Sequence, residues 1–139
     1  MKKRKREKKK TERKMNCLYG GLEVAQTGEY QAMKALMAKG VIDHGGALAV
    51  AANEGHADIA ELIIQDSLAK IVQYPKTDSR YYCARITEHD YDYAMRLASQ
   101  NIPMQTTEHD YDMILALHYN RMKVKRVLEQ FRDQLSKFF

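Results

Sequence analysis

Apolar residues recur at helical spacing between residues 21 and 64, in short runs that glycines separate. A shift of 26 positions superposes one set of these residues on another. Each set predicts a short helix, a break at residues 27–29 or 54–56, and a second helix. Helix pairs this short cannot bury an apolar face alone, so we expect them to stack. The matched positions are Leu22 with Leu48, Ala25 with Ala51, Met33 with Ile59, and Leu36 with Leu62.

The second half of the chain repeats this pattern more weakly. Residues 93–99 predict a first helix, but Ile102-Pro103 follows, so its partner helix is expected to be missing or short. Residues 113–128 predict a further pair, with Asn120 in the place of the glycine. Alternatively, nothing in residues 104–139 requires a break, and this part forms one long helix. The end of the chain predicts an amphipathic closing helix with a stripe of Val124, Val127, Leu128, Phe131, Leu135 and Phe138.

Residues 46–64, GALAVAANEGHADIAELII, resemble the core of an ankyrin repeat. The resemblance implies two antiparallel helices, with small Ala51 and Ala52 where neighbouring repeats meet and Gly55 at the turn. It also implies a structural role for His56, in capping or local backbone bonding. The resemblance covers residues 20–65 well and 88–130 poorly, and these short repeats are most similar to giant-virus or intracellular-bacterial members. It implies an all-α solenoid that binds other proteins.

Charge divides the chain into a basic tail, residues 1–14, and a helical repeat domain, residues 15–139. The net charge is +5, but residues 2–14 hold ten bases and two acids, so the tail carries +8 and the body −3. The tail suits a nuclear import signal, nucleic-acid binding without sequence preference, or a solvated end. No aromatic residue interleaves it, which disfavours base stacking. Its candidate contacts are Lys2, Lys3, Arg4, Lys5, Arg6, Lys8, Lys9 and Lys10.

The sequence also indicates a compartment. No apolar run approaches the length that crosses a bilayer, and no apolar segment follows the basic N-terminus as in a secretory signal. Cys17 and Cys83 are isolated, without CxxC spacing, so we expect partly buried, unpaired thiols in a reducing compartment. These features predict a cytoplasmic or nuclear protein that is not secreted.

The hexapeptide TEHDYD occurs twice, at residues 87–92 and 107–112. It supplies His and carboxylates for a metal, but helix capping explains more of it, because a Thr cap with an acid three residues later satisfies free N–H groups. We therefore predict capping and no metal. A short acidic turn would also present Tyr91 or Tyr111 accessibly, and whether a kinase modifies either stays open.

Motifs for catalysis are absent. Gly45 is not followed by Lys-Ser or Lys-Thr as in a P-loop, and neither a Gly-x-Ser-x-Gly nor a His-Glu-x-x-His motif occurs. A Cys83–His89 dyad would lack an orienting third group. We therefore expect a non-enzymatic protein with no cofactor and no small-molecule substrate.

These observations predict an all-α, ankyrin-like solenoid of stacked antiparallel helix pairs that binds another protein. The alternative is a basic-tailed, nucleic-acid-associated helical protein whose body dimerises through the residue 131–139 stripe. The candidate partner contacts are polar or acidic positions that core packing does not explain: Asp43, His44, Asn53, Glu54, Asp90, Tyr91 and Asp92.

Overall fold

The computed structural model describes residues 17, 18, 20–100 and 108–139, without the side chains of residues 108–111. Within these residues the chain is all-helical and contains no strand. None of the described helices is both long enough and apolar enough to cross a membrane. The helices are α2 (Gly21–Thr27), α3 (Tyr30–Lys39), α4 (His44–Glu54), α5 (Ala57–Ile71), α6 (Ser79–Ala84), α7 (Glu88–Ser99) and α8 (Glu108–Ser136).

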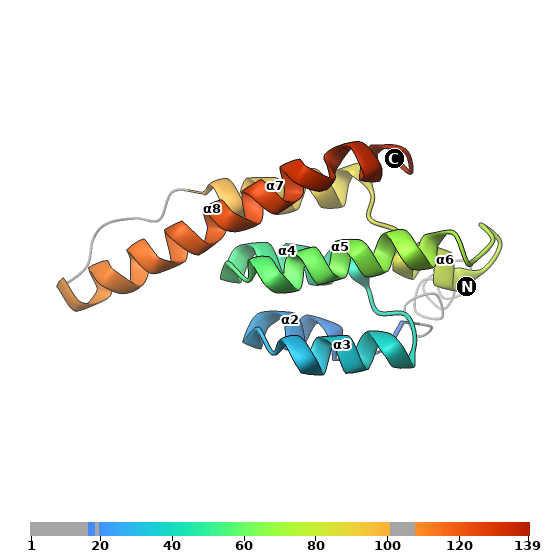
Figure 1. The fold of residues 1–139 in the computed structure, drawn as a ribbon, viewed down its shortest axis with the longest axis horizontal. Helices are drawn as coiled ribbons and strands as arrows, with labels where there is room; N and C mark the ends of the chain where they lie inside the picture. The colour runs from blue at the N-terminus through green and yellow to red at the C-terminus, as the bar shows by residue number, and fades with distance from the viewer. Residues whose placement is uncertain (1–16, 19, 101–107) are drawn as a thin grey trace, which may run out of the picture.

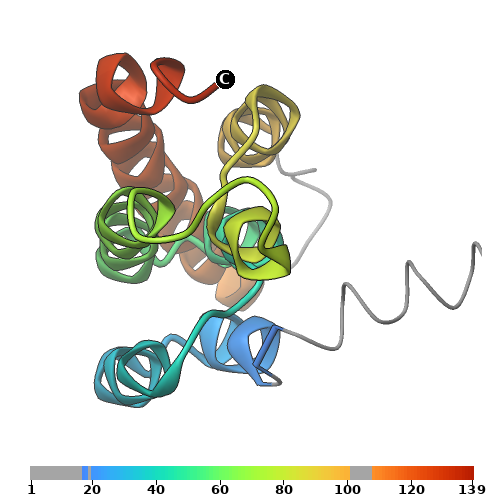
Figure 2. The same ribbon diagram turned by 90° about the vertical axis from the view of Figure 1, so that its right-hand side faces the viewer.

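Six of these helices form three stacked layers (Figure 1). The pair α2/α3 lies at one side, α4/α5 in the middle, and α7/α8 at the other side. Viewed end-on, α2, α4 and α7 form one row, and α3, α5 and α8 form a second (Figure 2). The middle layer contacts both outer layers, through α2·α4 and α4·α7 in one row and α3·α5 and α5·α8 in the other. The core therefore centres on α4 and α5.

The spacing of 26 residues corresponds to the first two layers. Ala25 of α2 and Ala51 of α4 are fully buried, and so are Met33 of α3 and Ile59 of α5. The prediction of two stacked helix pairs is thus confirmed for residues 21–71. Leu22 departs from the pattern, because it is exposed although its counterpart in α4 is buried.

Glycine ends the first helix of each of these pairs. Gly28 and Gly55 both have φ of 75°, in the left-handed region that favours glycine. His56 follows the second of these turns, and its Nε2 lies 3.1 Å from the carbonyl oxygen of Gln26. Its structural role is therefore to join two layers, and the expected local capping is wrong, since its side chain makes no cap bond.

The third layer is built differently, because α8 is a single 29-residue helix. Asn120 lies inside it, and no described residue other than glycine has a positive φ. The predicted helix pair at residues 113–128 is therefore wrong, and the alternative of one long helix is correct. Gly55 packs against this helix so closely that a Cβ there would lie 2.8 Å from the Cβ of Asn120.

The predicted apolar stripe of the closing helix is confirmed in its central part. Val124, Leu128, Phe131 and Leu135 are buried against the rest of the chain. The protein's own core thus already covers Phe131 and Leu135, two residues of the 131–139 stripe through which the nucleic-acid alternative expects the body to dimerise.

The two cysteines form a disulfide, so the prediction of unpaired thiols is wrong. Cys17 and Cys83 have their Cα atoms 5.9 Å apart and lie 66 positions apart in the sequence. Closing a loop of this length stabilises a fold by about 4 kcal/mol in the chain-entropy description. The bond ties the segment before α2 to α6, a short helix that the sequence did not predict. Since disulfides persist mainly in oxidising compartments, cysteine usage no longer supports a reducing one.

Candidate functional site

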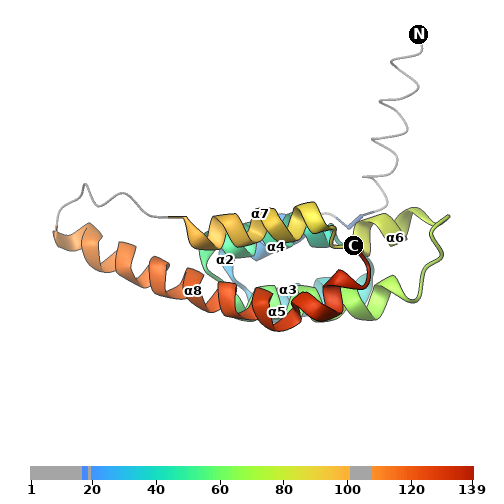
Figure 3. The same cartoon turned by 90° about the horizontal axis from the view of Figure 1, so that it is seen from above.

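An open groove of about 420 Å³ runs along the row of first helices, across all three layers. Its walls come from α2, α4 and α7, which form one row in Figure 2 and lie over one another in the view from above (Figure 3). The stacking creates it, because each layer contributes the outward positions of its first helix. The lining residues are Leu22, Glu23, Gln26, Ala49, Val50, Asn53, Glu54, Tyr93 and Leu97.

This groove combines exposed apolar side chains with acidic charge. Leu22 and Tyr93 expose 47 % and 45 % of their surface and border it from the two outer layers. Glu23 and Glu54 are the only charged residues among its described lining. Exposed large apolar side chains beside carboxylates suit a ligand that presents apolar groups and positive charge.

Two of the predicted contact residues line this groove, namely Asn53 and Glu54. Asn53 already has one partner within the chain, because its backbone carbonyl oxygen accepts a hydrogen bond from Arg121 Nε at 2.9 Å. Asp92 is exposed on α7 but does not line the groove. Asp43 lies at the start of α4, where its carboxylate accepts a hydrogen bond from the amide of Gly46 at 3.2 Å.

The first TEHDYD copy caps α7, as predicted. The hydroxyl oxygen of Thr87 accepts from the amide of Asp90 at 3.1 Å, and the Asp90 carboxylate accepts from the amide of Thr87 at 3.0 Å. Asp90 is therefore engaged in its own helix. The second copy leads into α8, but Thr107 and the side chain of Tyr111 are outside the described residues.

Tyr91 does not lie on the surface, which contradicts its prediction as a partner contact and as an accessible phosphorylation site. It is buried, and its hydroxyl donates to the carbonyl oxygen of Leu128 at 2.9 Å. Burial raises the pKa of Tyr91, so the phenol keeps the proton that this bond requires. The residue joins α7 to α8.

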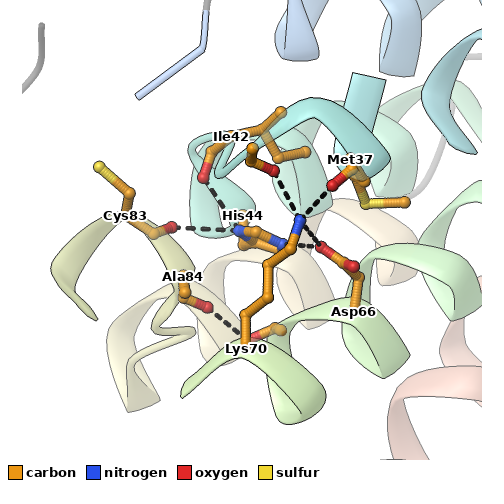
Figure 4. Close-up of polar contacts among 9 residues, drawn as sticks. Met37, Ile42, His44, Asp66, Lys70, Cys83 and Ala84 are labelled. Atoms are coloured by element: carbon orange, nitrogen blue, oxygen red, sulfur yellow. Dashed lines mark hydrogen bonds and ion pairs between the residues drawn. The ribbon is translucent and has the colours of Figure 1, made fainter. Parts of the chain in front are cut away.

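His44 was also a predicted contact residue, and it is fully buried. Its Nδ1 lies 2.9 Å from the carbonyl oxygen of Ile42 and 3.3 Å from that of Cys83, and its Nε2 lies 2.7 Å from Asp66 Oδ2 (Figure 4). Every one of these partners is an acceptor when Asp66 is ionised. Each ring nitrogen is therefore held by an oxygen atom of the surrounding chain.

Asp66 is held in its ionised form. Burial raises the pKa of Asp66, but hydrogen bonds from His44 and Lys70, together with their positive charges, outweigh burial and leave the pKa below its ordinary value. Lys70 Nζ lies 3.0 Å from Asp66 Oδ2 and also donates to the carbonyl oxygens of Met37 and Gly40. The cluster thus ties α3, α4 and α5 together (Figure 4).

This polar cluster is organised for structure and not for chemistry on a ligand. Neither nitrogen of His44 is left for a substrate, and the ring has no exposed surface. Across the described part of the chain, no three His, Cys, Asp or Glu side chains gather as a metal site would require. The groove is therefore the best candidate for a functional site.

Sequence reasoning missed the apolar half of the groove. Leu22 was matched to Leu48 as an apolar position of the repeat, and Tyr93 was read only as the start of a predicted first helix. Helical spacing does not mark either side chain as exposed, so only the placement of α2 and α7 shows that no layer covers them. The predicted tail contacts, residues 2–10, are outside the described residues.

Comparison with known proteins found no match: no family model, no curated protein and no solved structure resembles this chain to a significant degree. The similarity to ankyrin repeats therefore rests on the sequence pattern of the chain, which residues 46–64 carry most clearly.

Proposed function

We propose that this protein is a non-catalytic protein–protein interaction module whose three layers form an abbreviated, ankyrin-like solenoid. Two features support the architecture: a turn at a left-handed glycine in each of the first two layers, and fully buried alanines where these layers meet. The third layer diverges from it through the long helix α8.

The groove along α2, α4 and α7 is the observation that carries the proposed function. Its partner is a segment of another protein that presents apolar side chains next to Lys or Arg. Leu22 and Tyr93 anchor the apolar side chains, since large exposed apolar and aromatic groups dominate binding energy at interfaces. Glu23 and Glu54 select positive charge and speed association.

A displayed library of random peptides, selected on the oxidised full chain, tests this proposal. Enriched peptides should combine apolar residues with Lys or Arg. Tyr93→Ala and Leu22→Ala should each weaken the selected peptides about tenfold or more. Leu115→Ala is the matched control, because Leu115 is as exposed as Tyr93 but lies on α8 outside the groove, and it should leave binding unchanged. Selection of peptides that bind all three variants equally would overturn the proposal.

The basic tail, residues 1–14, has a separate role in this proposal, as a nuclear import signal on a cytoplasmic or nuclear protein, where the Cys17–Cys83 disulfide would have to persist against reduction. Deleting it should move a fluorescent fusion out of the nucleus and leave the affinity of the selected peptides unchanged. Loss of peptide binding on deletion would instead support the nucleic-acid alternative, in which the tail carries the binding.

A further inference from the structure

A second pocket, of about 230 Å³, lies between α6 and the end of the chain after α8. Its described lining combines positive side chains with aromatic rings and includes no acidic side chain. This composition is the reverse of the acidic groove on α2, α4 and α7. The lining residues are Lys76, Tyr81, Tyr82, Arg85, Lys137, Phe138 and Phe139.

Arg85 is the residue that most clearly indicates a ligand. Its Nε is buried and has no hydrogen-bond partner within the described part of the chain. Buried donors are almost always paired, and a guanidinium carries five N–H groups in a planar fork that suits phosphate oxygens. Lys76 and Lys137 add positive charge at the same pocket.

Two of the aromatic rings that line the same pocket are open to solvent. Tyr82 exposes 54 % and Phe139 exposes 37 % of its surface. Tyr81 is buried beneath and meets the ring of Tyr82 edge to face, with centroids 5.4 Å apart. Tyr82 is thus supported on one side, which suits stacking of a planar group on its free face.

The disulfide connects this pocket to the most basic part of the chain. Cys83 lies in α6 next to Tyr82, and its partner Cys17 follows the tail by three residues. The disulfide therefore links the part of the chain that follows this segment of charge +8 to the helix that carries Tyr82. The tail lacks aromatic residues, and the pocket supplies them.

We propose that the pocket between α6 and the chain end binds one nucleotide unit of a single-stranded nucleic acid. Arg85, with Lys76 and Lys137, contacts the phosphate, and the base stacks on Tyr82 or Phe139. The tail contributes attraction to neighbouring phosphates. A single strand is favoured over a duplex because its bases are free to stack on the exposed rings.

Fluorescence anisotropy with a labelled oligothymidine tests this site on the oxidised full chain. Tyr82→Ala should weaken binding about tenfold, and Tyr82→Phe should restore it, because stacking needs the ring and not the hydroxyl. Arg85→Met should also weaken binding. Tyr119→Ala is the matched control, since Tyr119 is an exposed tyrosine with Lys123 Nζ 4.7 Å from its ring centroid, yet lies outside the pocket. It should bind like the unaltered protein.

Competitors and a deletion separate the pocket from the tail. Inorganic polyphosphate and a DNA duplex should compete less well than unlabelled oligothymidine. Deleting residues 1–14 should lower affinity and flatten its salt dependence, while the Tyr82→Ala effect persists. Three outcomes would overturn the proposal. They are competition by polyphosphate equal to that by oligothymidine, tighter binding of a phosphopeptide than of oligothymidine, and unchanged affinity for oligothymidine in both Tyr82→Ala and Arg85→Met. The groove variant Tyr93→Ala should not affect this binding, so the two proposals fail independently.

Discussion

The two halves of α8 carry apolar residues at similar helical spacing, and only one half is covered. In the C-terminal half, Val124, Leu128 and Leu135 are buried in the core. In the N-terminal half, Met113, Leu115, Tyr119 and Met122 remain 44–70 % exposed. Helix length explains the difference, because 29 residues span about 44 Å whereas the 15 residues of α5 span about 22 Å. The first turns of α8 extend past the α4/α5 layer (Figure 1).

This contrast shows that a helical apolar pattern predicts which face of a helix can be buried. The neighbouring helices decide along which part of its length that face is buried. The halves meet near Arg121, whose guanidinium reaches the end of α4 at Asn53. Four predictions test the difference in burial between the two halves of α8 and the contacts that hold the covered half.

The largest difference is expected between two leucines of α8. Leu128→Ala should lower the free energy of unfolding by about 2–5 kcal/mol, because it removes buried methylene groups and leaves a cavity. Leu115→Ala should change it by less than about 0.5 kcal/mol, because that side chain is largely exposed. Urea unfolding followed by circular dichroism measures both. A similar loss in both variants would show that the N-terminal half is also covered in solution.

Arg121→Met should cost about 1–2 kcal/mol, since it removes charged hydrogen bonds to the backbone and side-chain oxygens of Asn53 near the C-terminus of α4. Methionine keeps the buried stem of the side chain. We also expect faster amide exchange in residues 112–120 of this variant. Arg126→Met, at an exposed position on the same helix, serves as the control and should be neutral. Unchanged exchange would mean that the boundary between the halves lies elsewhere.

Tyr91→Phe removes the hydroxyl that holds the covered half to α7. The expected loss of stability is about 0.5–1.5 kcal/mol, the usual net contribution of one hydrogen bond. Tyr93→Phe, on the exposed side of the same helix, should be neutral. Thermal melts of the two variants make the comparison, and equal melting temperatures would contradict the role of the bond to Leu128.

The smallest effect concerns α5, the helix that covers α8. The pKa of Asp66 is lowered in the folded state, so its contribution to stability is present above its unfolded pKa of about 3.9 and is lost as pH falls through the lower, folded value. Solvent screening limits this contribution, since the Asp66 side chain keeps 21 % of its exposure. The stability difference between the unaltered protein and Asp66→Asn should therefore shrink below about pH 4. Asp92→Asn, at an exposed position, should show no such convergence.

Local patterns predicted the elements that local physics controls. The helix pairs of the first two layers, the turns at Gly28 and Gly55, and the Thr87 cap all depend on residues close together in the sequence. The helix α6 was missed because its six residues carry no apolar periodicity and it is stabilised by a disulfide to Cys17. His44 and Tyr91 were misassigned because a polar residue among apolar ones suggests a surface site when its distant partners are unknown.

The sequence by itself determined the helical class, the positions of the first two helix pairs, and the separation of a basic tail from a mildly acidic body. The tertiary structure decided which apolar residues are buried and which polar residues find hydrogen-bond partners inside the chain. Asp66 lies 22 positions from His44, and Leu128 lies 37 positions from Tyr91. The groove and the basic pocket likewise combine segments from different layers, and helical periodicity contains no information about such pairings.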